Sequence, residues 1–597
     1  MRYSFIFSYG PWPNSIILAI ISKLFSLLLE GPLKSFSAFT VIFISLSFLS
    51  AHTYEPDWGR EARVEVGENR SNIYNIESSE EFADTVRAGF IHALHYPVSV
   101  TGLYIPYGPL INLLEAEHDN ALRRFIQRAT SARAGFSNEQ EMYEWLGLSP
   151  YNDIDAEGIY QIPYPGGLTE RPSFHMGASI VDTPRGKGLT FSCATCHSAE
   201  LFGQSVIGLN NKKAQANQFF VMAKKTVPFI PSYFFQRATD ATDDERDMFR
   251  ETKQNLRSVG AIDPQVLGLD TSLPQVALSL SRRSRDANAS KSRFYETFPR
   301  VNPLDRFVAD SKPGVWWTLK YKTRWLSDGS IVEGNPILTN FLWNELGRGT
   351  DLDELKQWME ENPETIKELT AAAFATQAPR WSDFFDPVQT INLPRAKRGE
   401  KIFNQSCKEC HGQYVKGWSQ NNPYMSLEEK IETIEVRYHE KTPVKNVGTD
   451  PQRWMGMNHF AEDLNNLEIS KWMETVVEPQ EGYVPPPLNG IWARYPYFHN
   501  NSIPNLCALL TPPDQRPRVF IQGPSQNPET DFSFDCVGYP TEDEIPSSWW
   551  ANSSAVFDTN RPGLRNTGHY RMLLDDEGNE KYTPSQKRDL IEYLKTL

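Results

Sequence analysis

Apolar residues recur at helical spacing in three stretches of the first two thirds of the chain. Residues 79–94 open with serine and acidic residues and then place Phe82, Val86, Phe90 and Leu94 one turn apart, which predicts an amphipathic helix. Two further helices are predicted over residues 351–361 and 362–374, the second with proline near its start and glutamate in its first turn.

Two more helices are predicted in the last third. Residues 396–403 form an amphipathic segment that leads directly to a cysteine, and residues 583–594 begin with a Thr-Pro-Ser-Gln capping box followed by an apolar stripe. Between the helical regions, residues 377–394 contain three prolines and little periodicity, which is typical of an interdomain linker.

The first fifty residues have the pattern of an export segment. An apolar run from residue 38 to residue 49 follows Lys34 and ends in small residues before His52, which resembles a cleavable signal. A second apolar run, residues 16–29, is interrupted by a lysine. We therefore predict that residues 1–52 are an export signal or a membrane anchor, and that the protein is periplasmic or secreted, or anchored to the inner membrane.

Composition and charge narrow the class of protein. The 597 residues are rich in aromatic side chains, and 42 prolines with 36 glycines indicate long irregular connections between helices. The formal net charge of -14 excludes a protein that binds nucleic acid through a general basic surface, so no nucleic-acid partner is expected.

One pentapeptide pattern, CxxCH, occurs twice, as CATCH at residues 193–197 and CKECH at residues 407–411. It is typical of covalent c-type haem attachment, in which two thiols bind the porphyrin and the histidine binds the iron. A zinc knuckle requires two cysteine pairs close together in the sequence. A redox dithiol is not normally followed directly by a histidine. The sequence thus predicts two covalently bound c-type haems, held by Cys193, Cys196, Cys407 and Cys410, with His197 and His411 as iron ligands.

The two remaining cysteines, Cys507 and Cys536, are free to pair in an oxidising compartment, although two buried thiols would also fit.

The distribution of histidines separates the two predicted haems. After His197 the chain has no histidine until His411, so the first haem is left with His175, Met176, Met222 or a residue of the preceding extension as a sixth ligand. We expect an open or weakly ligated first iron, because each of these residues is more typical of packing. The second region instead offers many ligands, namely His439, His459, His499, His569, Met425, Met455, Met457 and Met473.

These residues resemble the bacterial di-haem cytochrome c peroxidase and MauG superfamily. The likeness rests on the two CxxCH motifs about two hundred residues apart and on residues 495–506, which look like the family's PYFHDGS segment with Asn500 and Asn501 in place of Asp-Gly. The length, the paired tryptophans at 316 and 317 and the C-terminal residues are closer to the large branch that contains the rubber oxygenases. The resemblance covers roughly residues 160–597 and is strong only at the haem motifs.

The resemblance implies a mainly α fold with two cytochrome c-like haem domains and long irregular loop insertions. The domains would be an extension at 53–160, a first haem domain at 161–376, the linker at 377–394 and a second haem domain at 395–597. In class I cytochromes c, which the helices at 396–403 and 584–594 resemble, the first and last helices cross at a small residue against an aromatic ring. Gly399 and Tyr593 would make that contact.

The resemblance also implies site residues. It favours His569 over His499 as the sixth ligand of the second haem, and it places Trp317 between the haems as a catalytic electron relay, although core packing is an equal expectation for a tryptophan. The first haem would bind peroxide or dioxygen and act on an organic substrate, with a periplasmic donor as an electron-transfer partner. The absence of a histidine soon after the first CxxCH departs from the short peroxidases and favours the oxygenase-like branch.

Two other functions stay open at the level of sequence. One is a non-catalytic electron-transfer cytochrome c with two six-coordinate haems, and the other is a substrate-binding envelope protein in which haem is structural.

Overall fold

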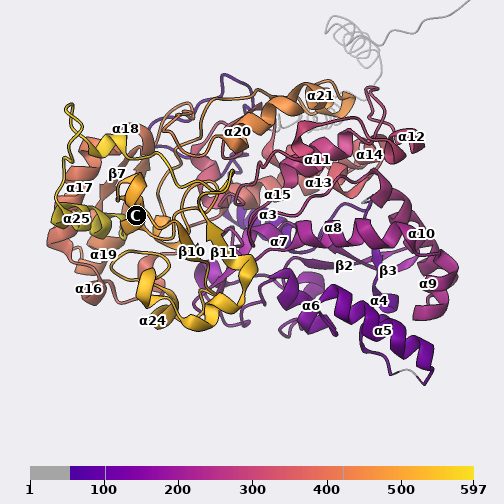
Figure 1. Ribbon diagram of the computed structural model, residues 1–597. Helices are drawn as coiled ribbons and strands as arrows, with labels where there is room; N and C mark the ends of the chain where they lie inside the picture. The colour runs from indigo at the N-terminus through magenta and orange to yellow at the C-terminus, as the bar shows by residue number, and fades with distance from the viewer. Residues whose placement is uncertain (1–53, 101, 118, 421) are drawn as a thin grey trace, which may run out of the picture. The chain divides into compact units, whose positions relative to one another are not determined.

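The computed structural model describes residues 54–597 except 101, 118 and 421, and residues 57–597 form one compact unit. Helices dominate this unit, and its strands are short and pair in twos or threes (Figure 1). The predicted export segment at 1–52 lies outside the described residues. Within the described part of the chain, none of the helices has the length and apolar character needed to span a bilayer.

The helices up to residue 375 include the helical turn of the first CxxCH motif. They are α3 (Ser79–Leu94), α4 (Tyr107–Glu115), α5 (Ala121–Ala134), α6 (Glu139–Leu146), α7 (Ala194–His197), α8 (Ala216–Thr226), α9 (Ser232–Thr239), α10 (Asp243–Asn255), α11 (Ser272–Leu280), α12 (Arg293–Thr297), α13 (Pro336–Arg348), α14 (Leu352–Glu361) and α15 (Pro363–Ala375).

The later helices are shorter apart from α17 and α25. They are α16 (Pro387–Thr390), α17 (Leu393–Ser406), α18 (Lys408–His411), α19 (Leu427–Glu432), α20 (Gln452–Gly456), α21 (Ala461–Asn465), α22 (Glu468–Trp472), α23 (Leu506–Leu509), α24 (Pro528–Asp531) and α25 (Pro584–Leu594).

All strand pairs are antiparallel. The largest sheet has the order β1-β3-β2, from Ile105–Pro106, Gly186–Phe191 and Ala178–Thr183. The two-stranded pairs are β4 (Ser198–Leu201) with β5 (Gln204–Ile207), β6 (Ile331–Glu333) with β9 (Val476–Val477), β7 (Gln413–Lys416) with β8 (Ile434–Arg437), and β10 (Val519–Ile521) with β11 (Val556–Asp558).

The five predicted helices are present, with the caps that the sequence indicates. Ser78 accepts a hydrogen bond from the Glu81 amide at the start of α3, and Asp351 caps α14. At α25 the predicted capping box forms reciprocally between Thr583 and Gln586. Local signals therefore define these helix ends.

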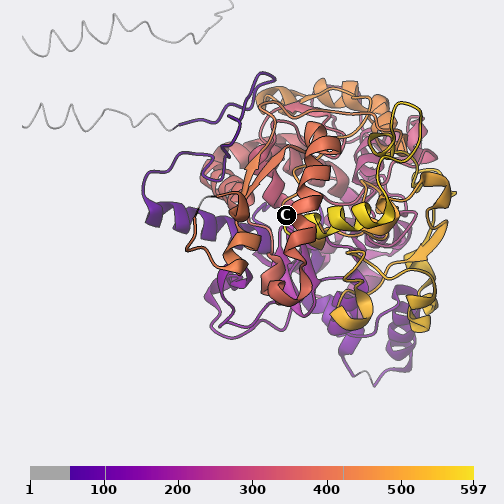
Figure 2. The same ribbon diagram turned by 90° about the vertical axis from the view of Figure 1, so that its left-hand side faces the viewer.

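The contact between α17 and α25 is the one that the cytochrome resemblance predicts (Figures 1 and 2). A Cβ atom added to Gly399 would lie 2.0 Å from the Asp589 carbonyl oxygen and 2.9 Å from Tyr593 Cβ, so only glycine allows this approach. The Tyr593 ring also packs on Phe403, with ring centres 5.3 Å apart. The expected crossing of Gly399 and Tyr593 is confirmed.

A second close crossing joins α3 to α15 (Figure 1). A Cβ atom on Gly89 would lie 1.9 Å from the Glu368 carbonyl oxygen, and His92 Nε2 lies 2.8 Å from the Glu368 carboxylate. Helix α3 comes from the predicted extension at 53–160. Along the chain, each CxxCH motif thus falls between two helices that cross at a glycine. The sequence predicts this crossing only for the second motif.

The two large apolar cores exchange chain segments. The first core, built mainly around α11, α13 and α15, also contains Met457, Phe460 and Leu464 from the last third of the chain. The second core, built around α17 and α25, also contains Leu201 and Val206 from the hairpin after the first motif. The predicted domain boundaries stay predictions, but neither core is built from one continuous stretch.

The predicted linker at 377–394 contributes to the second core. Trp381 and Phe385 are buried there, and the Trp381 ring lies 5.4 Å from the ring of Trp492. The prolines of this segment therefore shape a packed connection, which contains the short helix α16.

Candidate functional site

Each motif histidine sits on a single helical turn and is held by a backbone carbonyl. His197 Nδ1 lies 2.9 Å from the Gly314 oxygen, and His411 Nδ1 lies 2.9 Å from the Pro486 oxygen. Because a carbonyl oxygen only accepts, Nδ1 carries the proton and Nε2 keeps a free lone pair. A carbonyl that fixes the tautomer in this way is the usual support for a metal-binding imidazole.

Both imidazoles are neutral over the physiological pH range. Burial lowers the pKa of His197 to about 4 and that of His411 to about 4, with the carbonyl hydrogen bonds opposing the shift in each case. A neutral imidazole is the form that binds a metal ion.

All six cysteines are accounted for. Cys507 and Cys536 form a disulfide, which confirms the predicted pairing, whereas the four motif cysteines are free thiols. The described residues hold no cluster of three or more His, Cys, Asp or Glu side chains suited to a metal ion, so they lack the four-ligand arrangement of a zinc knuckle.

One cavity of about 620 Å³ connects the two motifs. Its lining includes the four motif cysteines, the two motif histidines and both histidines favoured for the second haem, namely Cys193, Cys196, His197, Cys407, Cys410, His411, His499 and His569. The motif thiols and the available imidazole nitrogens fit the covalent attachment of a porphyrin at each motif.

The cavity wall is cationic although the protein is acidic. Six cationic side chains line it, Lys312, Lys322, Lys445, Arg348, Arg453 and Arg494, against two carboxylates, Asp270 and Glu409. Burial and then the charge of Arg494 lower the pKa of Lys322 to about 8. An anionic group in the cavity would relieve this repulsion, and the carboxylates of a porphyrin are such groups.

His569 lies opposite the histidine of the second motif. The ring centres of His411 and His569 are 6.1 Å apart. An imidazole nitrogen binds a transition metal at about 2 Å and lies about 1 Å from its ring centre, so two imidazoles on one ion have centres about 6 Å apart. The observed separation therefore leaves room for one metal ion between the rings.

Backbone contacts with residues 447 and 448 fix the loop that carries His569. The His569 amide donates to the Val447 carbonyl at 2.8 Å, and a Cβ atom on Gly568 would lie 2.2 Å from the backbone carbon of Gly448. Burial first, then the charges of His411 and Arg516, lower the pKa of His569 to about 3, so the ring is neutral.

His499 also lines the cavity but has a different environment. Its ring stacks on Tyr483 with centres 3.8 Å apart, and its buried Nε2 has no hydrogen-bond partner among the residues that the structure describes. The structure thus brings both predicted ligands to the cavity and sets His569 against His411.

The first motif has no such partner. His175 stacks on Tyr143 and its Nδ1 lies 3.0 Å from the Leu148 oxygen, while Met176 is buried in the first core. Neither these residues nor Met222 belong to the described cavity wall, whose histidines and methionine are His197, His411, His499, His569 and Met572.

Carboxamides line the cavity near the first motif instead. Asn217 of α8 donates to Gln275 of α11 at 3.1 Å, and Gln275 donates to the Gly347 carbonyl of α13 at 2.9 Å. Asn340 and Asn344 of α13 belong to the same wall. The sequence analysis missed these residues, because amide side chains carry no recognisable spacing.

The paired tryptophans point in different directions. The ring of Trp316 lies 5.2 Å from that of His197 and lines the cavity. Trp317 is fully buried in the second core, where its Nε1 donates to the Asn489 carbonyl at 2.9 Å. The relay role assigned to Trp317 stays a prediction, and Trp316 is the tryptophan that touches a predicted iron ligand.

Comparisons with known proteins indicate a cytochrome c-like segment over part of the chain. Residues 482–521, which include His499, match a family model described as "RoxA-like, cytochrome c-like". The chain is 28% identical over 267 residues to the uncharacterized protein y4iJ of Sinorhizobium fredii (strain NBRC 101917 / NGR234), covering 37% of this chain and 41% of that protein.

A second protein of the same strain, the uncharacterized protein y4iM, is 28% identical over 222 residues, which cover 34% of this chain and 49% of that protein. The matched region thus spans less than half the length of these relatives. The family match suggests a haem-containing redox protein.

Proposed function

We propose that this chain is a periplasmic di-haem c-type oxidoreductase, in which a reactive first haem and an electron-relaying second haem share one cavity. Cys193, Cys196 and His197 would hold the first haem. Cys407, Cys410, His411 and His569 would hold the second, with His499 as the other ligand for its sixth position.

The observation that carries the proposal is the unequal supply of ligands along one cavity wall. The His411 ring lies 6.1 Å from that of His569, whereas the ring that packs beside His197 among the described residues is that of Trp316, at 5.2 Å. A c-type haem supplies one-electron chemistry when bound, and an iron with an open position also binds peroxide or dioxygen.

The chain's own groups support such a division. The Gly314 and Pro486 carbonyls orient the two motif imidazoles, and the cationic wall suits the carboxylates of two porphyrins. The amides of Asn217, Gln275, Asn340 and Asn344 offer uncharged hydrogen-bond donors near the first motif. The substrate would be peroxide or dioxygen together with an organic molecule, and a periplasmic donor would supply electrons.

The match of residues 482–521 to a RoxA-like, cytochrome c-like model supports a redox role for a haem-containing protein. The alternative from another class is a non-catalytic electron-transfer cytochrome c with both haems six-coordinate.

Spectroscopy of the haem-loaded protein separates these functions. We expect two covalently bound haems per chain, with carbon monoxide perturbing the spectrum of one reduced haem. Only low-spin haem without any response to carbon monoxide or peroxide would instead establish the electron-transfer cytochrome.

Ligand variants test the assignment of the second haem. H569A should convert one low-spin haem to high spin, whereas H499A should leave it low-spin. H459A is the matched control, since His459 packs on Phe307 and is not part of the described cavity wall. A high-spin second haem in H499A and not in H569A would reverse the assignment. Parallel assays with hydrogen peroxide and a donor, and with polyisoprene and oxygen, then define the reaction.

A further inference from the structure

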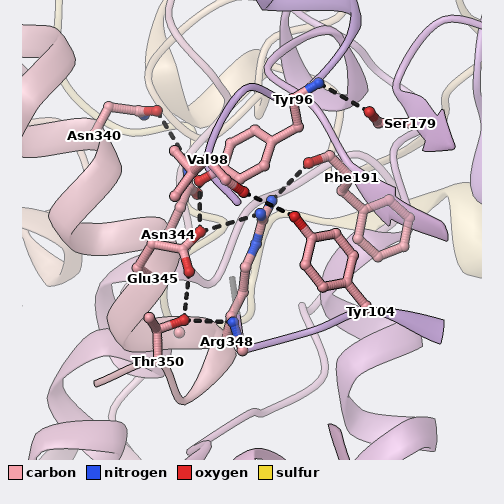
Figure 3. A network of polar contacts seen from close by, with 12 residues as sticks. Tyr96, Val98, Tyr104, Ser179, Phe191, Asn340, Asn344, Glu345, Arg348 and Thr350 are labelled. Carbon is pink, nitrogen blue, oxygen red and sulfur yellow. Dashed lines mark hydrogen bonds and ion pairs between the residues drawn. The ribbon is translucent and has the colours of Figure 1, made fainter. Parts of the chain in front are cut away.

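A fully buried carboxylate, Glu345, organises a polar network behind the first motif (Figure 3). Glu345 accepts a hydrogen bond from the Tyr96 hydroxyl at 2.6 Å and another from the Thr350 hydroxyl. Its Oε1 atom also lies 3.2 Å from Nη1 of Arg348, one turn further along α13. Buried carboxylates persist when they are paired and hydrogen-bonded in this way.

The network fixes the position of the Arg348 guanidinium. Nη2 donates to the Phe191 carbonyl at 2.7 Å, and the guanidinium carbon lies 4.0 Å from the centre of the Tyr96 ring. Phe191 is two residues before Cys193. The carboxylate, the carbonyl and the ring together hold the cation beside the first attachment site.

Arg348 and Glu345 are not equivalent with respect to the cavity. Arg348 belongs to the described cavity wall with Phe191, Cys193 and Cys196, whereas Glu345 is not part of that wall. The cation of the pair is therefore the member that lies at the cavity with the first motif. Such a pair is screened little by salt because protein surrounds it.

A fixed cation beside a redox centre stabilises the form that has gained an electron. Removing the cation should lower the reduction potential, and neutralising the carboxylate behind it should raise the potential. The sign of each change follows from Coulomb's law, whatever the effective dielectric constant.

We propose that Arg348, positioned by Glu345 and Tyr96, raises the reduction potential of the haem attached at Cys193 and Cys196. Glu345 and Tyr96 are thus positioning residues, and the charge of Arg348 biases the electron toward the first haem. This inference rests on the proposed function, in that the first motif must carry a haem.

The test is a spectroelectrochemical titration of the haem-loaded full chain that resolves a midpoint for each haem. R348M should lower the first-haem midpoint and E345Q should raise it, while the second-haem midpoint stays where it is. The double variant R348M/E345Q should fall between the two single variants. R348K keeps the charge and should restore most of the wild-type midpoint.

Two controls separate charge from structure. Y96F removes a hydrogen bond to Glu345 without changing charge, so its first-haem midpoint should shift less than in R348M. D589N disrupts a buried carboxylate that pairs with Arg395 and Arg398 on α17, at 3.0 and 2.8 Å, and should leave the first-haem midpoint unchanged.

The outcomes separate the proposed di-haem function from the proposed effect of Arg348 on the first-haem potential. A protein that carries no haem at the first motif, by mass and by haem stain, overturns the proposed function. Two intact haems with first-haem midpoints that do not move in opposite directions in R348M and E345Q overturn the role of Arg348. A Y96F shift as large as that of R348M also overturns it, because it would indicate loss of packing.

Discussion

The helix crossings at Gly399 and Gly89 give a quantitative prediction about stability. In G399A the new Cβ atom would lie 2.0 Å from the Asp589 carbonyl oxygen, and in G89A it would lie 1.9 Å from that of Glu368. Real Cβ contacts are essentially never shorter than 3.0 Å, so α17 and α25, or α3 and α15, must separate by about 1 Å in these variants.

The expected cost follows from two opposing effects. Overpacking of a buried contact costs about 1–3 kcal/mol, whereas alanine in place of glycine within a helix contributes up to about 1 kcal/mol of stability. The net loss is on the order of 1–2 kcal/mol in each variant. For the compact unit at residues 57–597, an unfolding entropy of about 2.1 cal/mol/K per residue means that about 1 kcal/mol lowers the melting temperature by only about 1 °C, so a decrease of roughly 1–2 °C is expected.

Thermal unfolding followed by circular dichroism measures this effect. G108A is the matched control, because Gly108 lies in α4 and a Cβ atom there meets only the end of the Glu245 side chain, at 3.2 Å. Its melting temperature should be unchanged or slightly raised. If G399A and G89A have the same melting temperature as the wild type, the two helix pairs are not in the close contact described.

Three further predictions concern a carboxyl group, the disulfide and a tryptophan. Burial raises the pKa of Asp310 to about 7, so this group contributes stability below about pH 4 that is lost as the pH rises through about 7. D310N should therefore flatten the pH dependence of the free energy of unfolding between these limits, and an unchanged profile would contradict it. Removing the Cys507–Cys536 disulfide, which spans a separation of 29 residues, should cost roughly 3–4 kcal/mol in denaturant unfolding of C507S/C536S, and equal midpoints with and without reductant in the wild type would argue otherwise. W316F should change the absorption of the first haem alone, because the Trp316 ring lies 5.2 Å from that of His197, and a matching change at the second haem would refute this.

Local chemistry is the part of this protein that its sequence predicts well. The helix caps, the disulfide and the Gly399–Tyr593 contact all depend on residue types at short spacing or on a known pairing of helices. The role of the two CxxCH motifs in haem attachment stays a prediction. Both predicted ligands of the second haem, His499 and His569, line the cavity. Periodicity identifies the apolar face of a helix but does not identify its partner, so the pairing of α3 with α15 could not be predicted.

Other features depend on burial that no local pattern encodes. Glu345 and Arg348 look like an ordinary surface pair one turn apart on a helix, because charged residues are rarely fully buried. Neighbouring residues of the 3₁₀ helix at Trp316–Tyr321 point to different sides, so the sequence does not decide which tryptophan meets the cavity. The exchange of segments between the two cores likewise follows from the tertiary fold.

The exchange of segments between the two cores links the two chain segments whose carbonyls contact His197 and His411. Gly314, whose carbonyl contacts His197, lies between Lys312 and the 3₁₀ helix that contains Trp317. Pro486, whose carbonyl contacts His411, precedes Asn489 and Arg494 in the chain. Lys312 Nζ donates to the Arg494 and Pro496 carbonyls at 3.0 and 2.6 Å, and Trp317 Nε1 donates to the Asn489 carbonyl at 2.9 Å. The Trp317 bond is buried and the two Lys312 bonds are partly buried, so breaking them leaves polar groups with few other partners. A shift of one loop therefore displaces the other, so the two imidazoles cannot be reoriented independently. Trp317 joins the two supports mechanically, whether or not it also carries an electron.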